Sequence, residues 1–178
     1  MKIKILTFSL LLLLFGCSSN NPGSTQSSNL SDMPNWCESA KKNGYYYSCG
    51  FSKMKNPALA KSTAEARSRA ELATAVETEV RTLVQSFLEE SGENNQSEVS
   101  EYAVAIAQTS SSSILSMSTI DEQIYGKDNV YYTLIKLDID KVVDSAVNAV
   151  KNNKALSDKL NAMGRIDEMN QRFDSLKN

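Results

Sequence analysis

Histidine is absent from this chain of 178 residues. That absence excludes nucleophilic triads that rely on histidine, histidine-ligated zinc, and the side chain that most often serves as a general base near neutral pH. The sequence also has no glycine-rich phosphate-binding loop. We therefore expect no catalytic residues, no cofactor and no enzyme activity.

Carboxylates are the remaining candidates for chemistry. Asp121 and Glu122 are adjacent, and Asp138 and Asp140 are two residues apart. Paired acids serve glycosidases, and clustered acids bind calcium. No Asp/Asn-rich loop with a glycine and a closing glutamate follows Asp138, however, and acids on the wet faces of strands and helices usually only keep those faces solvated. The sequence predicts no metal site.

A strong charge of either sign is missing too. The chain carries 19 basic and 21 acidic residues, which gives a formal net charge of −2 at pH 7. A mildly acidic protein has no electrostatic basis for binding nucleic acid or an anionic surface. We expect no nucleic-acid partner.

Only one long apolar run is present, and it lies near the N-terminus. It spans residues 5–15, follows Lys2 and Lys4, and is too short for a permanent membrane span. A basic segment before such a run is typical of a bacterial export signal. Residues 14–17, LFGC, resemble the lipobox of bacterial lipoproteins. The alternative is an ordinary signal peptide that is cut elsewhere, with Cys17 incidental.

The lipobox resemblance implies cleavage after residue 16 and acyl chains of the palmitate kind on Cys17. Several acyl chains on one residue anchor a protein stably to a membrane. Serines follow Cys17, with no aspartate beside it, and by analogy this favours the outer membrane of a bacterial envelope. Residues 17–31 are nearly all Ser, Asn, Gly, Pro, Thr and Gln, a composition that predicts a flexible tether.

Cys37 and Cys49 are the other two cysteines. An exported protein enters an oxidising envelope, where pairs of thiols persist as disulfides. Zinc needs about four ligands, and the spacing is not the C-x-x-C of redox catalysts. We predict a disulfide across the turn at Asn43 and Gly44. Unpaired thiols are the alternative.

Residues 32–153 are expected to form one domain. The sequence predicts a short helix over residues 34–42, a strand over 45–52, and a long helix over 57–90 that Asn56 caps. The expected core stripe of the long helix comprises Ala66, Ala70, Ala73, Val76, Val80, Leu83 or Val84, and Phe87.

The second half of the domain is expected to complete a sheet. Residues 98–108 predict a helix that the run TSSSS then loosens, and the segments 114–125 and 130–138 predict strands joined by a four-residue hairpin loop. On one face of the first of these strands we expect Ser118, Ile120, Glu122 and Ile124. A helix over residues 140–152 follows, and residues 154–178 predict one further amphipathic helix. The predicted fold class is α+β, with a three-stranded antiparallel sheet packed on one long helix and additional C-terminal helices.

Four groups of residues follow one another in order over residues 32–149. They are Pro34 and Trp36; Ser48, Cys49, Gly50, Phe51 and Ser52; Ala60, Ala64, Ala66, Arg67, Ala70, Leu72 and Ala73; and Tyr131, Tyr132, Leu137 and Asp138. Together these features resemble the Lpp-twenty family of bacterial envelope lipoproteins and their flagellar outer-membrane relatives. The resemblance implies a dodecin-like βαββ core and a structural, adhesive or flagellum-associated role without enzyme activity.

Two sets of residues are candidates for partner binding. Tyr45, Tyr47 and Tyr132 are candidates to line a groove, although aromatic residues on strands usually pack a sheet. Met169 and Phe173 belong to the apolar edge of residues 154–178, which suits either a partner or the protein's own domain. Two hypotheses follow. The first is a structural or assembly lipoprotein that self-associates, and the alternative is a binding or adhesion module that presents a Tyr-rich sheet to a ligand or host component.

Overall fold

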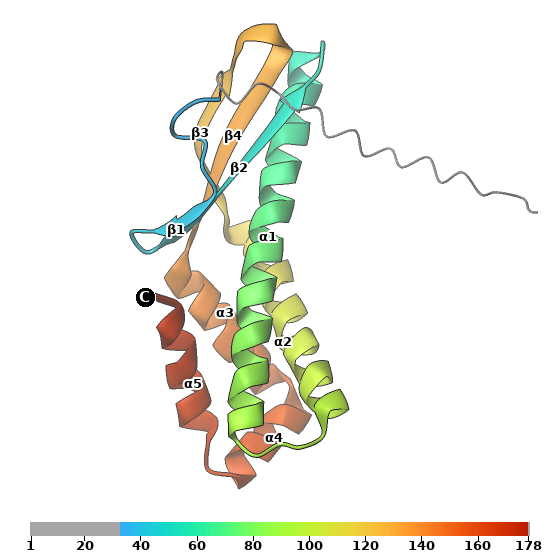
Figure 1. The fold of residues 1–178 in the computed structure, drawn as a ribbon, viewed down its shortest axis with the longest axis vertical. Coiled ribbons are helices and arrows are strands. Elements are labelled where there is room, and N and C mark those ends of the chain that lie inside the picture. Colours follow the sequence, from blue (N-terminus) through green and yellow to red (C-terminus); the bar gives the residue numbers. More distant parts are fainter. Residues whose placement is uncertain (1–32, 178) are drawn as a thin grey trace, which may run out of the picture. The chain divides into compact units, whose positions relative to one another are not determined.

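The computed structural model describes residues 33–177 (Figure 1). The predicted signal peptide (residues 1–16), the predicted lipidation of Cys17 and the predicted tether (residues 17–31) lie outside the described residues. The described elements, in chain order, are β1 (Ala40–Lys42), β2 (Tyr45–Lys53), α1 (Pro57–Glu90), α2 (Gln96–Met117), β3 (Thr119–Tyr125), η2 (Lys127–Asn129), β4 (Val130–Asp138), α3 (Ile139–Asn152), α4 (Lys154–Ala162), α5 (Ile166–Asp174) and η3 (Ser175–Lys177).

The sheet is antiparallel, with the strand order β1-β2-β4-β3, and α1 packs against it. The predicted α+β class is therefore confirmed, but the sheet has four strands rather than three. The helix predicted over residues 34–42 is wrong, because Ala40–Lys42 pairs with β2 instead. Asn43 and Gly44 both have positive φ, 52° and 79°, and this two-residue turn folds the chain straight back on itself.

Helix α1 begins as predicted and approaches β2 closely. The Asn56 side chain accepts hydrogen bonds from the amides of Ala58 and Leu59. Further along, Gly50 of β2 lies so near α1 that a Cβ atom on it would stand 2.2 Å from the Ala64 carbonyl oxygen. The strand and the helix thus touch backbone to backbone.

The predicted core stripe of α1 is correct only in the second half of the helix. Ala66 and Ala70 are exposed, and Ala73 is only half-buried. The first half is rich in small residues, so apolar spacing alone does not identify its inner face; the close approach of Gly50 does. The buried residues of α1 are Ala60, Ala64, Ser68, Leu72, Val76, Val80, Val84, Phe87 and Leu88.

Helix α2 is longer than the sequence predicts. The run TSSSS does not loosen it, because each hydroxyl of residues 109–113 donates a hydrogen bond to a carbonyl three or four residues earlier in the same helix. The following strand therefore starts at Thr119 and not at residue 114.

Strand β3 lies at one edge of the sheet, and all its residues are exposed. A register shift between Ile120 and Glu122 puts these two residues opposite consecutive residues of β4, Ile135 and Leu134. They therefore point to opposite faces, and the prediction that Ile120 shares a face with Glu122 and Ile124 is wrong. One extra residue in a strand reverses the alternation beyond it.

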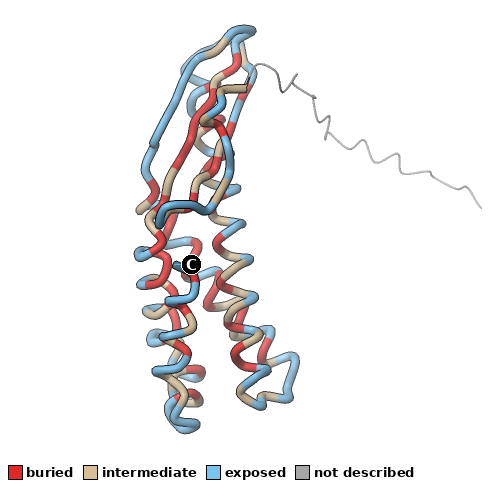
Figure 2. Tube along the Cα trace, turned by 60° about the vertical axis from the view of Figure 1, so that its left-hand side comes forward, coloured by how far each residue is buried: buried red, intermediate tan, exposed pale blue. Residues whose placement is uncertain are grey.

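The C-terminal segment forms two helices and not one. Gly164 adopts φ +67°, a left-handed conformation, and separates α4 from α5. Buried residues, red in Figure 2, concentrate where the elements face one another. The main core joins α1, α2, α3, α4, α5 and the inner face of the sheet, and a second cluster lies on the outer face, away from α1.

Candidate functional site

Residues 33–39, which precede the sheet, are bonded covalently to β2. Cys37 and Cys49 form a disulfide with their Cα atoms 5.2 Å apart, the pairing that the sequence analysis predicts. Cys37 is 5% exposed and packs with Val130 and Tyr132 on the outer face of the sheet. The chain is therefore fixed to its domain at the first residues that the structure describes.

The three consecutive tyrosines of β2 point to both faces of the sheet. Tyr46 is buried on the inner face, whereas Tyr45 and Tyr47 are half-buried on the outer face with ring centroids 6.2 Å apart. Lys136 Nζ lies 5.6 Å from the Tyr45 ring centroid, and Lys42 Nζ lies 5.3 Å from that of Tyr47. Both rings thus belong to a partly exposed cation–π cluster.

Tyr132 does not join this cluster as an accessible ring. It is 5% exposed, because residues 33–39 cover it. The prediction that it lines a partner-binding groove is corrected on this ground: a side chain that the protein's own N-terminal segment covers offers no surface to a ligand.

The Tyr46 side chain is hydrogen-bonded to helix α1. Its hydroxyl donates a hydrogen bond to Glu79, and Lys41 Nζ lies 2.8 Å from the other oxygen of the same carboxylate. Burial, and then the bond to Glu79, raise the pKa of the Tyr46 phenol well above its usual range. This triad of side chains ties β1, β2 and α1 together at the end of the sheet.

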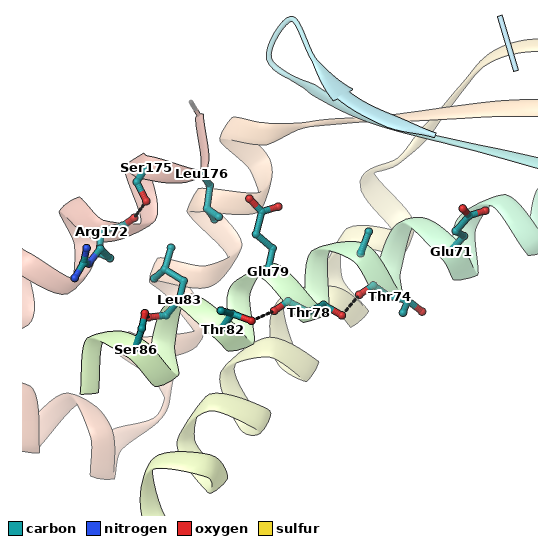
Figure 3. Close-up of a pocket in the computed structure, with 11 residues that line it drawn as sticks. Glu71, Thr74, Thr78, Glu79, Thr82, Leu83, Ser86, Arg172, Ser175 and Leu176 are labelled. Carbon is teal, nitrogen blue, oxygen red and sulfur yellow. Dashed lines mark hydrogen bonds between the residues drawn. The ribbon is translucent and has the colours of Figure 1, made fainter. Parts of the chain in front are cut away.

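Helix α1 forms the floor of an open groove of about 860 Å³ that begins beside β1, where the Ser39 hydroxyl donates to Glu71, and continues past the sheet (Figure 3). Helix α5 and the turn η3 supply one wall. We call this surface the α1 groove. It is lined by Glu71, Thr74, Ala75, Thr78, Glu79, Thr82, Leu83 and Ser86 of α1, together with Arg172, Ser175 and Leu176.

The floor of the α1 groove is less polar than its composition suggests. The hydroxyls of Thr74, Thr78 and Thr82 each donate to the carbonyl four residues earlier in α1, and Ser86 donates to the carbonyl of Leu83. A hydroxyl that is already satisfied within the helix leaves its methyl group to face outward. Covering this floor would therefore leave few polar groups unpaired.

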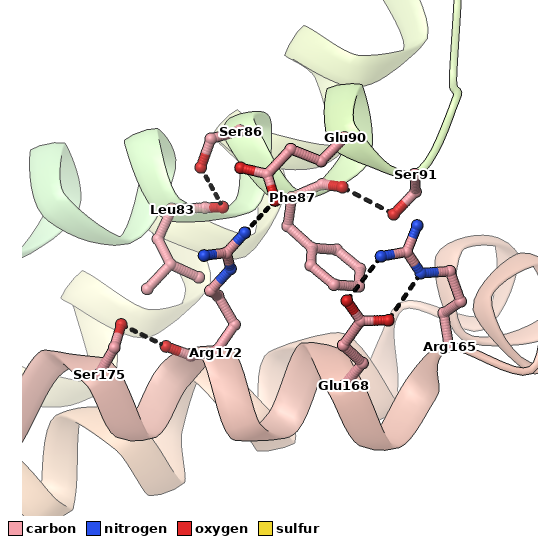
Figure 4. Close-up of polar contacts among 9 residues, drawn as sticks. All are labelled: Leu83, Ser86, Phe87, Glu90, Ser91, Arg165, Glu168, Arg172 and Ser175. Carbon is pink, nitrogen blue, oxygen red and sulfur yellow. Dashed lines mark hydrogen bonds and ion pairs between the residues drawn. The ribbon is translucent and has the colours of Figure 1, made fainter.

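One ion pair and one cation–π contact join the α5 segment to α1 (Figure 4). Arg172 of α5 pairs with Glu90 of α1. Arg165, the residue immediately before α5, lies 5.0 Å from the Phe87 ring centroid and donates two hydrogen bonds to Glu168, of 2.8 and 2.6 Å. These bonds lower the pKa of the Glu168 carboxyl below its usual value. Helix α5 is thereby held in one position along α1.

Met169 and Phe173, the other candidates for partner binding, are both fully buried in the main core. The α5 edge packs on its own domain, the other outcome that the sequence left open. A role for these two side chains in contacting a partner is corrected accordingly, since neither reaches the surface.

The acidic residues near β4 have structural tasks. Asp138 accepts a hydrogen bond from the amide of Asp140 and so caps α3, while Asp140 lies 3.0 Å from Lys177 Nζ. Lys136 pairs with Asp121 at 2.6 Å. Within residues 33–177 no three Cys, Asp or Glu side chains gather as metal ligands would.

Comparison with family models, curated proteins and solved structures found no match. The function is therefore argued from the chain alone. Among residues 33–177, no helix has both the length and the apolar character needed to cross a membrane.

The α1 groove is the feature that sequence reasoning missed. Thr74, Thr78 and Thr82 recur every four residues and are exposed, which is unusual for a helix in which long charged side chains normally face water. That recurrence was the available signal. It was hidden because the position of α5, which makes the wall, depends on tertiary packing.

Proposed function

We propose that this protein is a non-catalytic lipoprotein of the bacterial envelope, held in the outer membrane by acyl chains on Cys17, with a structural or assembly role that involves self-association. The tether over residues 17–31 would hold the folded domain away from the lipid. The dodecin-like arrangement and the link to surface or flagellar structures, both implied by the family resemblance, belong to the same proposal.

The observation that carries the proposal is the covalent bond between residues 33–39 and β2. In a domain that is attached to a membrane through its N-terminal segment, any pulling force acts through residues 33–39. The Cys37–Cys49 disulfide passes that force directly into a strand that lies between β1 and β4. Such a bond at this place suits an anchored structural protein.

Cell fractionation tests the anchoring. The full chain should be recovered with outer membranes, and mass spectrometry should find an acylated cysteine at the mature N-terminus. Cys17→Ala, made in a chain whose residues 1–16 are replaced by an ordinary cleavable signal peptide, should move the protein to the soluble fraction while leaving its circular dichroism spectrum unchanged. Recovery of Cys17→Ala with the membrane in undiminished amount would contradict lipid anchoring.

A second candidate function, a binding or adhesion module, is favoured by the exposed cluster of Tyr45 and Tyr47 with their two lysines. Its test is a pull-down from solubilised envelope with the wild type and with the double variant Tyr45→Ala/Tyr47→Ala. Tyr125→Ala, an exposed tyrosine on β3, is the matched control. If the double variant folds and captures the same proteins as the wild type, this candidate function is wrong.

A further inference from the structure

The α1 groove is closed along one side and open along the other. Helix α1 is its floor and α5 rises along one side, while the side formed by Thr74, Thr78 and Thr82 is open (Figure 3). Thr74, Thr78 and Thr82 are exposed. At 1.5 Å per residue, the floor from Glu71 to Ser86 is about 22 Å long, which corresponds to about four helical turns.

The two ends of the α1 groove carry opposite charges. Glu71 lines the end near the sheet, and Arg172 lines the end near Leu83 and Ser86. Arg172 pairs with Glu90, but that carboxylate does not line the groove, and a guanidinium has five N–H groups to share. An occupant should therefore offer a base near Glu71 and an acid near Arg172.

A second copy of this chain, meeting the first through its own α1 groove, satisfies that requirement. When two α1 helices lie antiparallel about a two-fold axis at Thr78, Glu71 of each copy faces the end of the groove where Arg172 of the other lies. In this arrangement the α1 helix of each copy would occupy the open side of the other copy's α1 groove, opposite α5. Glu79, which is next to the axis, is already balanced by Lys41.

We propose that this chain forms a two-fold symmetric dimer through its α1 groove, with Thr78 on the axis and two Glu71–Arg172 ion pairs at the rim. This inference rests on the proposed self-association and names its surface. Dimers of this symmetry are the commonest soluble assemblies, and each residue on the axis meets its own copy. The small residues of the floor allow the two helices to approach closely.

Cysteine cross-linking in the oxidising envelope tests the axis. The full chain with Thr78→Cys should run as a disulfide-linked dimer on a non-reducing gel and as a monomer after reduction. Ala66→Cys is the matched control, since Ala66 is an exposed small residue of the same helix outside the groove, and it should stay monomeric. Mass spectrometry should find the Cys37–Cys49 bond intact in both variants.

Charge reversal tests the ion pairs independently. In sedimentation of the full chain in detergent, Glu71→Arg and Arg172→Glu should each raise the dimer dissociation constant roughly tenfold, because each breaks two symmetric pairs. The double variant Glu71→Arg/Arg172→Glu should restore most of the affinity. A double variant as weak as the sum of the two single variants would overturn the pairing.

The outcomes separate this inference from the proposed function. If the wild type associates but Thr78→Cys gives no dimer, the surface is wrong and self-association stands. If Thr78→Cys instead links to a different protein, the groove has another occupant and the two-fold dimer is wrong. If the wild type is a monomer at every concentration, self-association itself fails, and the dimer fails with it.

Discussion

Gly50 is the residue at which β2 and α1 come into backbone contact. A Cβ atom there would lie 2.2 Å from the Ala64 carbonyl oxygen and 2.6 Å from the Ser68 amide nitrogen. Beside it, the Ser68 hydroxyl donates to the carbonyl of Ser48. Glycine thus allows the strand and the helix to pack at a distance that no other residue permits.

We predict that Gly50→Ala destabilises the protein by about 2–3 kcal/mol, because both clashing atoms belong to the helix backbone and cannot turn aside. Gly126→Ala is the matched control. A Cβ atom on Gly126 meets nothing nearer than a Tyr132 ring carbon at 3.4 Å, and its stability should change by less than about 1 kcal/mol. Urea unfolding of both variants decides the matter, and equal midpoints would contradict the backbone contact.

Tyr46 gives the protein a pH dependence at the alkaline end. Its folded-state pKa lies above the ordinary value of 10.0, so the folded state holds the phenol proton more tightly than the unfolded chain does. The resulting stability is fully present below about pH 10 and is lost as the pH rises above it, by up to about 1.4 kcal/mol per pH unit.

We predict that Tyr46→Phe removes this part of the alkaline loss, at a cost of about 1 kcal/mol near pH 8 for the missing bond to Glu79. Free energies of unfolding at pH 8 and pH 11 test both effects. Tyr47→Phe, on the outer face of the same strand, should keep the wild-type dependence. An unchanged alkaline slope in Tyr46→Phe would show that the phenol does not carry it.

At the scale of elements, the sequence predicts the helix ends and strands that depend on neighbouring residues in the chain. Asn56 and Pro57 mark the start of α1, and residues 130–138 read as a strand from their β-branched and aromatic content. Local signals fail where a distant contact decides. The close approach of Gly50 determines which face of α1 is buried near Ala64. Contact with Phe87 determines the position of α5.

Helix α5 provides a test of that packing. Phe173→Ala should destabilise the protein by about 3–5 kcal/mol and Met169→Ala by about 2–5 kcal/mol, because both side chains are fully buried. Met163→Ala, at a residue that is 37% exposed between α4 and α5, should cost less than about 1 kcal/mol. Thermal unfolding measures all three variants, and a stable Phe173→Ala would return Phe173 to the list of candidate contacts.

At the scale of the whole molecule, two attachments follow one another along the chain. The proposed acyl chains and tether would connect the membrane to residue 32, and the structure then shows residues 33–39 fixed to the sheet by Cys37 and by the cluster around Tyr132. The α1 groove begins beside β1 and continues past the end of the sheet. In the proposed arrangement, the protein would be attached at one end of its chain, and α1 would be available to meet another copy.

The disulfide should therefore stabilise the attachment more than the core. In the chain-entropy model, closing a loop across a sequence separation of 12 residues contributes about 3 kcal/mol. We predict that the double variant Cys37→Ser/Cys49→Ser loses about this much free energy of unfolding. Hydrogen exchange should speed up most in residues 33–39 and at Tyr132. The amides of α1 should speed up only by the factor that the lower free energy of global unfolding requires, because α1 draws its burial from the main core. Uniformly faster exchange throughout the domain would show that the bond supports the entire fold rather than the attached segment.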